Sequence, residues 1–235
     1  MNQNINFEDT PVIAYPRWQR LMEMSSIWLF AIFSVLLCVA ILGALFSDRS
    51  ASLSAVWRFA LISTPLLGYI AAEFGAGLVH CLADNFGAND TPIFGKAFIK
   101  PFRDHHADPA GITRHDFIEA NGNNCLITLL MIIPTFALIS WYPTPAVIFG
   151  AAFVLFLALC TVMTNQIHKW AHLAKPPYAI ELLQRFGLIL SPESHAIHHT
   201  SPHDRNYCIT SGWLNPIIEK FGVFSTIVRI LKRGA

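Results

Sequence analysis

Four long apolar stretches run through this chain, and their length determines the solvent in which it folds. They cover approximately residues 27–46, 57–79, 125–141 and 146–166, and the first and last contain no charged side chain. A helix of about 20 apolar residues crosses the roughly 30 Å hydrocarbon layer of a bilayer. Because lipid offers no partners to backbone amides, such stretches must be helical. The sequence therefore predicts an all-α integral membrane protein with four transmembrane helices.

The charges support this interpretation and predict its orientation. Charged residues make up only 13% of the chain, against about 25% in a typical soluble domain. The net charge of +1 gives no general attraction to nucleic acid, so no nucleic-acid partner is expected. All lysines and arginines except Arg49 and Arg58 fall on the side that holds both termini. The positive-inside rule then places both termini in the cytoplasm.

Outside the spans, two stretches combine apolar and charged residues. Residues 178–190 and 217–231 are predicted to form amphipathic helices at the membrane interface. Residues 1–24 are predicted to form a cytoplasmic tail, and residues 25–235 a single membrane domain. The long segments between and after the spans carry the histidines, so we expect a histidine-rich cap on the cytoplasmic side.

All ten histidines lie between His80 and His203, on the predicted cytoplasmic side or at its membrane boundary. Residues three or four apart share one face of a helix. This spacing relates His80 to Asp84, His168 to His172, and His195 to both His198 and His199. Ser191 followed by Pro192 predicts the start of the helix that carries the last three.

Clustered imidazoles form a nitrogen-rich site for a borderline metal such as iron, zinc, copper or nickel. Eight candidates exceed the ligands of one tetrahedral zinc and suit two metal ions. The predicted ligands are His80, His105, His106, His168, His172, His195, His198 and His199. Four further residues are expected to act either as ligands or as hydrogen-bond partners of the bound imidazoles: Asp84, His115, His203 and Asn165.

Other classes of membrane metalloprotein fit the pattern less well. A metal transporter needs ionisable residues along a path through the bilayer, whereas the histidines gather at one end and, apart from Arg58 at the start of the second span, Glu73 is the only charged residue within a span. A bis-histidine haem needs facing histidines within spans, and the first and third spans have none. Five scattered cysteines without a C-x-x-C pair argue against a cysteine-held metal.

Several strings resemble one known family when read in order. They are HCLAD at 80–84, FRDHH at 102–106, TRHDFIE at 113–119, NQIHKWAH at 165–172, HAIHHTSPH at 195–203 and YCITSGWLN at 207–215. Together they resemble the plasmanylethanolamine desaturases, which form the vinyl ether of plasmalogens, over roughly residues 57–222. A plant relative with similar motifs desaturates an acyl chain of phosphatidylglycerol. An acyl-lipid desaturase or a hydroxylase with the same site is therefore the alternative.

The resemblance implies a membrane lipid desaturase domain with two iron ions, O₂ as oxidant and an ether phospholipid as substrate. An external electron donor is expected, such as a cytochrome b5 or a ferredoxin. The chain departs from the wider desaturase pattern at Asp84, which stands where the first histidine box would have a second histidine. Basic residues near the boundary are candidates to bind the lipid headgroup: Lys100, Arg103, Arg114 and Lys169, with Lys175 a further one.

Overall fold

The computed structural model describes residues 16–47, 53–92, 95 and 99–233. Every regular element in these ranges is helical, and four helices are long and apolar enough to cross a membrane, which confirms the predicted fold class. They are α1 (Arg17–Leu45), α2 (Ala55–Asn85), α4 (Phe117–Trp141) and α5 (Pro145–Ala171). Residues 1–15 of the expected tail, and Arg49, lie outside the described ranges.

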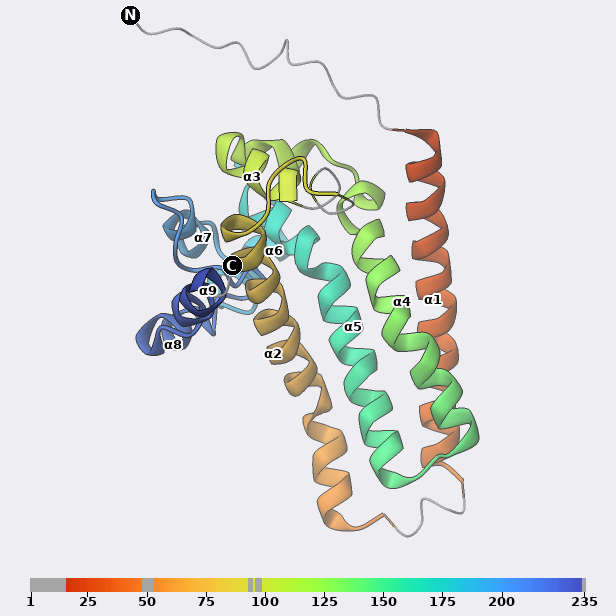
Figure 1. Cartoon of the computed structure of the whole chain (residues 1–235). Coiled ribbons are helices and arrows are strands. Elements are labelled where there is room, and N and C mark those ends of the chain that lie inside the picture. The colour runs from red at the N-terminus through yellow and green to blue at the C-terminus, as the bar shows by residue number, and fades with distance from the viewer. Residues whose placement is uncertain (1–15, 48–52, 93–94, 96–98, 234–235) are drawn as a thin grey trace, which may run out of the picture.

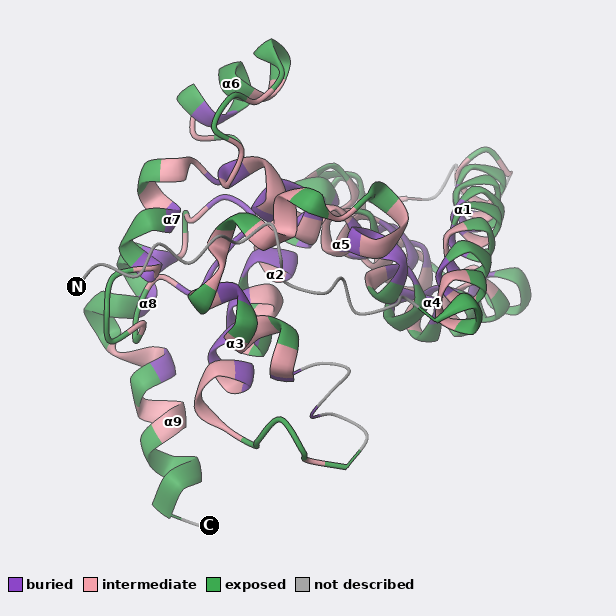
Figure 2. Cartoon of the chain, turned by 90° about the horizontal axis from the view of Figure 1, so that it is seen from above, coloured by how far each residue is buried: buried purple, intermediate pink, exposed green. Residues whose placement is uncertain are grey.

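The four long helices pack in the order α1, α4, α5, α2, which is not their order in the chain (Figure 1). Leu37, Ile132 and Ala158 are completely buried in the apolar core that α1, α4 and α5 share. The outward faces are apolar as well: Val35 is 62% exposed and Val39 60%, and exposed residues run along α1 in Figure 2. Such extended apolar exposure suits a hydrocarbon solvent.

The long helices continue past the predicted boundaries at the end that carries the histidines. α2 extends to Asn85 and α5 to Ala171, while α4 begins at Phe117 and α1 at Arg17. The apolar pattern of the sequence does not reveal these terminal turns of the helices, because their residues are polar. The Asp116 side chain caps α4 by accepting hydrogen bonds from two backbone N–H groups of its first turn. The extensions place His80 and His168 on rigid helix rather than in loops.

Six short helical segments complete the described part of the chain. They are α3 (Lys100–Ala107), the 3₁₀ helix η4 (Pro109–Arg114), α6 (Tyr178–Arg185), α7 (Pro192–His198), α8 (Asn215–Phe221) and α9 (Val223–Arg233). In Figure 1, α3 lies above α2 and α5, and α7, α8 and α9 lie beside the upper part of α2. The short helices therefore gather at the end of α2 and α5 that carries the histidines.

Three local predictions can be compared with these short helices. Ser191 caps α7 as expected, since its hydroxyl accepts a hydrogen bond from the N–H of Ser194. The single helix predicted over 217–231 is wrong, because Gly222 adopts a left-handed φ of 58° and separates α8 from α9. The helix predicted over 178–190 ends at Arg185.

Candidate metal centre

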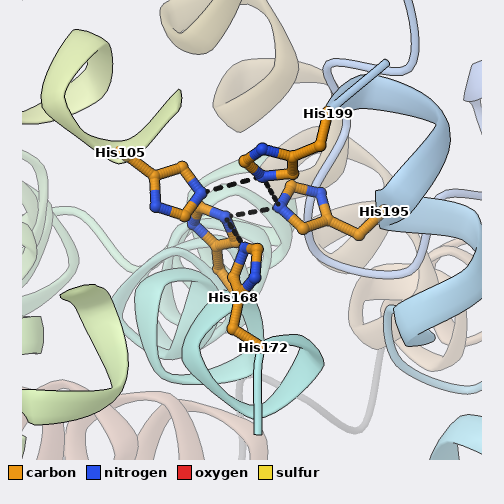
Figure 3. Close-up of side chains that lie close together, drawn as sticks. All are labelled: His105, His168, His172, His195 and His199. Atoms are coloured by element: carbon orange, nitrogen blue, oxygen red, sulfur yellow. Dashed lines mark hydrogen bonds between the residues drawn. The ribbon is translucent and has the colours of Figure 1, made fainter. Parts of the chain in front are cut away.

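Eight histidines and one aspartate converge in two neighbouring groups where α2, α3, α5 and α7 meet. The first group contains His105, His168, His172, His195 and His199, and Figure 3 shows their rings pointing toward one another. The second group contains His80, Asp84, His106 and His198. Within each group, the atoms available as metal ligands all lie within 4.8 Å of one another. The structure thus brings together all eight histidines predicted as ligands.

The imidazole nitrogens lie as close together as the ligands of one metal ion. The Nε2 atom of His195 is 2.7 Å from that of His168 and 3.0 Å from that of His199. Imidazole nitrogens bind a first-row metal such as zinc at about 2.0–2.1 Å, so two of them at right angles lie about 3 Å apart. Several ring nitrogens aimed at one point are the expected geometry around a cation.

Two histidine doublets link the groups. Adjacent residues on a helix point about 100° apart, because the helix has 3.6 residues per turn. In α3, His105 therefore joins the first group and His106 the second. His198 and His199 divide in the same way, with His106 Nε2 3.0 Å from His198 Nε2 and His105 Nε2 3.0 Å from His199 Nε2. Each doublet serves both groups.

Backbone carbonyls orient two of the rings. The Nδ1 atom of His80 lies 3.1 Å from the carbonyl oxygen of Tyr207, and that of His198 lies 2.9 Å from the carbonyl oxygen of Arg205. A ring that donates its Nδ1 proton to a carbonyl keeps an unprotonated Nε2, which is the tautomer that binds metal. In both residues the Nε2 atom faces the second group.

Asp84 supplies a carboxylate to the second group. Its Oδ2 atom lies 3.5 Å from the Nε2 atoms of both His80 and His106, and 3.6 Å from that of His198. Both carboxylate oxygens are buried and have no hydrogen-bond partner among the described residues. Burying a carboxylate that has no partner destabilises the folded protein. A cation bound at this point would compensate the buried charge. The donor set therefore fits a metal ion.

Four of the clustered histidines are neutral at physiological pH: His106, His172, His198 and His199. Burial lowers the pKa of His106, His172 and His199 to about 4 each. The pKa of His198 is lowered to about 3, mainly by burial. Neighbouring imidazoles lower the pKa of His106 and His199 further, because two protonated rings so close together would repel each other. Neutral imidazoles keep the lone pair that a metal requires.

The remaining polar candidates lie outside both groups. His115 is 3.6 Å from Glu119, with a side chain that is 44% exposed. Asn165 donates to the carbonyl of Ala120. His203 stacks on His106, with ring centroids 4.5 Å apart, and so lies at the edge of the second group. His203 therefore packs against the candidate ligand His106 and does not belong to either group.

Most of the predicted headgroup cations already have partners. Lys100 pairs with Asp104, Arg114 pairs with Asp108, and Lys169 donates to the carbonyl of His115. Arg103 differs from them, because it lines a cavity beside Asp84 and His106. Lys175 is exposed in the turn after α5. Of the predicted set, only Arg103 lines this cavity, although it too has partners, since it donates to the backbone carbonyls of Phe86 and Gly87.

Sequence reasoning missed the residues that hold the segment after α7 in place. Glu73, buried in α2, accepts hydrogen bonds from the backbone N–H groups of Thr210 and Ser211 at 3.0 and 2.7 Å. Asn215 exchanges two hydrogen bonds with the backbone of Cys208. These contacts fix the stretch whose carbonyls orient His80 and His198. The only signal in the sequence was a glutamate within an apolar span.

Comparison with known proteins identifies the family of this chain. A family model described as the lipid desaturase domain matches residues 69–234. A plasmanylethanolamine desaturase of Myxococcus xanthus is 40% identical over 233 residues, which is 98% of this chain and 79% of that relative. Plasmanylethanolamine desaturase 1 of Mus musculus is 43% identical over 175 residues, 70% of this chain and 62% of that relative.

Relatives of lower identity are fatty acid desaturases of plants. The chloroplastic fatty acid desaturase 4 of Arabidopsis thaliana is 36% identical over 162 residues, 68% of this chain and 48% of that relative. No solved structure matches the chain. The family match covers the residues of both histidine groups, and the bacterial relative aligns along nearly the whole chain. The chain therefore belongs to the family of proteins with a lipid desaturase domain.

Proposed function

We propose that this protein is a plasmanylethanolamine desaturase, which uses O₂ to introduce the vinyl-ether double bond into the alkyl chain of an ether phospholipid. The observation that carries the proposal is the pair of neighbouring nitrogen-rich groups at one end of four membrane-length helices. The bacterial and mouse relatives with this name support the substrate. The plant relatives support the alternative, an acyl-lipid desaturase, at lower identity.

The proposed cofactor is a pair of iron ions, one in each group. Iron bound there would supply the oxidising power to remove hydrogen from unactivated carbon, which no protein side chain provides. The proposed ligands are the eight clustered histidines and Asp84. His115, Asn165 and His203 are assigned to the surroundings of the ligands because they lie outside both groups.

The chain's own residues have three proposed tasks. The neutral imidazoles present lone pairs, and the Asp84 carboxylate offsets part of the metal charge. The carbonyls of Tyr207 and Arg205 keep two rings in the metal-binding tautomer. Burial of His80, His195 and His198 keeps bulk water away from the reacting centre.

The orientation and the electron supply are also proposals. The distribution of lysine and arginine supports a cytoplasmic location for both termini and the histidine cap. Electrons would then come from a cytoplasmic carrier such as a cytochrome b5 or a ferredoxin. The other parts of the proposed layout are a short N-terminal tail and one desaturase domain from residue 25 onward. Among the predicted headgroup cations, the position of Arg103 supports its role.

Lipid mass spectrometry tests the function directly. The protein is expressed in a host that makes alkyl ether lipids but no plasmalogens, together with an electron donor. We expect new acid-labile lipids lighter by two hydrogen atoms, and none with the His199→Ala variant. A new double bond in an acyl chain instead would favour the alternative. No lipid change from folded, iron-loaded protein supplied with a donor would refute both.

A further inference from the structure

The proposed reaction limits where the lipid headgroup can bind. In an alkyl ether phospholipid, the carbon that becomes part of the vinyl ether is attached to the ether oxygen of glycerol. Only six single bonds of about 1.5 Å each separate that carbon from the phosphorus atom. The phosphate must therefore lie within about 8 Å of the reacting carbon. On the proposed function, a headgroup site has to open directly onto the metal-binding residues.

One cavity meets this requirement. It has a volume of about 180 Å³ and is lined by Asp84 and His106 of the second group. Its other walls include Arg103, Asp204 and Tyr207. Its lining is mostly polar, which suits a headgroup rather than an alkyl chain. A ligand in this cavity would contact the same side chains that are proposed to bind iron.

A second cavity adjoins the first and extends along α9. It has a volume of about 440 Å³ and shares Asp204, Tyr207 and Asn85 with the first cavity. Phe224 and Val228 form an apolar part of its wall, and Arg229, Lys232 and Arg233 are its cations. The walls therefore change from apolar to cationic along one helix, as the boundary between the hydrocarbon chains and the phosphate of a lipid requires.

Cations from two elements come together near Phe86, at the end of α2. Arg103 of α3 donates to the carbonyls of Phe86 and Gly87 at 3.3 and 2.8 Å, which holds its guanidinium at the wall. Lys232 of α9 places its Nζ atom 6.0 Å from the centroid of the Phe86 ring. Arg103 lines the first cavity and Lys232 the adjoining one, and guanidinium and ammonium groups both bind phosphate.

The carboxylate of Asp204 is the only acidic group that the two cavities share. Asp204 follows His203 and is exposed to solvent. An ethanolamine headgroup carries a phosphate and, two carbons further, a primary ammonium group. The cations and Asp204 therefore match both charges of phosphoethanolamine. A glycerol headgroup has no cation for Asp204, and a choline headgroup has no N–H to donate.

We propose that the two adjoining cavities form the headgroup site, in which Arg103 and Lys232 bind the phosphate and Asp204 binds the ethanolamine ammonium. Asp204 then determines headgroup specificity, because a charge-assisted hydrogen bond to a primary ammonium is lost with other headgroups. This assignment rests on the proposed function. It retains Arg103 from the cations expected to bind the headgroup and replaces the others with residues of α9.

Competition between ether lipids tests the role of Asp204. Membranes that contain the full-length enzyme receive alkyl ether lipids with ethanolamine, glycerol and choline headgroups together, and the vinyl-ether products are measured. We expect Asp204→Asn to lower the ratio of ethanolamine to glycerol product by about 10-fold, the order of one hydrogen bond to a charged group. Asp90→Asn, an exposed aspartate that lines neither cavity, is the matched control. Unchanged preference in Asp204→Asn would overturn the assignment.

Loss of a phosphate contact should change the kinetics in a different way from loss of Asp204. Lys232→Gln should raise KM for all three lipids by a similar factor and leave their product ratio unchanged, because the phosphate is common to them. Arg185→Gln in α6, which lines neither cavity, controls for the loss of one exposed cation. A wild-type KM in Lys232→Gln would contradict the phosphate site.

A binding measurement separates this inference from the proposed function. Ser225 lines the second cavity, so Ser225→Cys reports its occupancy through labelling with a neutral maleimide in nanodiscs, measured as the excess over wild-type protein, whose own Cys81 lines the same cavity and whose Cys38 is exposed. Labelling should be slower in phosphatidylethanolamine than in phosphatidylglycerol, and Asp204→Asn should remove the difference. Equal rates would overturn the headgroup site even if vinyl ethers form. Slower labelling without vinyl-ether product would retain the site and reject the reaction.

Discussion

At the scale of single residues, the candidate centre depends on which histidine nitrogens can face one another. His198 is completely buried, its Nδ1 lies against a carbonyl, and its Nε2 faces Asp84 and His106. His115 is half-exposed and lies outside both groups. Both histidines occur in the sequence strings that resemble the desaturase family, but only His198 has the geometry of a ligand.

This contrast predicts the effect of removing each imidazole. His198→Ala should lose about half of the bound iron and reduce desaturation by at least about 100-fold. Mutating a residue that only hydrogen-bonds to a metal ligand already lowers metal affinity or activity by about 10–100-fold. His115→Ala should retain both iron ions and activity within a few-fold of wild type. Iron per protein and product per iron are the measurements. Full iron loading in His198→Ala would exclude it as a ligand.

The lowered pKa values predict how metal-free protein responds to acid. His106, His172 and His199 have a pKa of about 4 in the folded protein, below the ordinary value of 6.5. Between these values the unfolded chain binds more protons than the folded chain, so stability increases with pH in this range. The melting temperature of metal-free protein in detergent should therefore fall as the pH is lowered from 6.5 to 4.

A variant controls for other acid-sensitive groups. His199→Gln removes one partly buried imidazole, so its melting temperature should depend less steeply on pH between 6.5 and 4 than that of the wild type. A melting temperature that stays constant over this range would show that the rings gain protons in the folded protein as readily as in the unfolded chain. Far-UV circular dichroism of both proteins provides the comparison.

At the scale of elements, close contact between helices decides how they align. Gly68 of α2 lies against the backbone of α5, and a Cβ there would lie 2.7 Å from the backbone nitrogen of Leu157. Gly75 of the same helix has nothing within 4 Å of an added Cβ. One glycine is therefore needed for packing and the other is not. Because α2 and α5 carry His80 and His168, this contact also determines the spacing between histidines of the two groups.

The two glycines predict opposite effects of the same substitution. Gly68→Ala should destabilise the protein by about 1–3 kcal/mol, the usual cost of overpacking, and should lower iron occupancy. Gly75→Ala should be neutral or stabilise it by up to about 1 kcal/mol, because alanine favours helix. Unfolding in detergent by thermal melting tests both variants. Similar effects of the two substitutions would contradict the close α2–α5 contact.

At the scale of the whole molecule, the candidate metal centre connects long helices, which are stabilised by their mutual packing, with short helices that would not be stable alone. α4 and α5 pack along their length, whereas α3 has eight residues and α7 has seven. Isolated helices this short are unstable in water. Metal ions bound to the two groups would cross-link α3 and α7 to α2 and α5. The cap should therefore depend on metal more strongly than the membrane-spanning part.

Hydrogen exchange after metal removal tests this difference. Chelation should increase exchange in peptides from α3 and α7 by at least about 10-fold and leave α4 and α5 almost unchanged, because local opening follows local stability. Restoring iron should reverse the effect. Equal changes in the cap and in the long helices would indicate that the molecule is a single cooperative unit without this division.

The sequence by itself determined the class of fold and the identity of the candidate ligands. Uncharged stretches of about 20 residues can only be helices in lipid, and spacings of three or four place histidines on common faces. Ser191 and Pro192 likewise predict the start of α7. These are local properties, since each depends on neighbours within a few turns of the same helix.

Tertiary structure alone decided how the ligands divide and what surrounds them. The division of His105 from His106 depends on how α3 faces α7, and the orientation of His80 on a carbonyl from a segment 127 residues away. The same is true of Arg103, which the packing of α3 brings to the cavity that adjoins α9. Periodicity specifies the face of a helix but not the partner it meets, because that partner is selected by packing between segments distant in the chain.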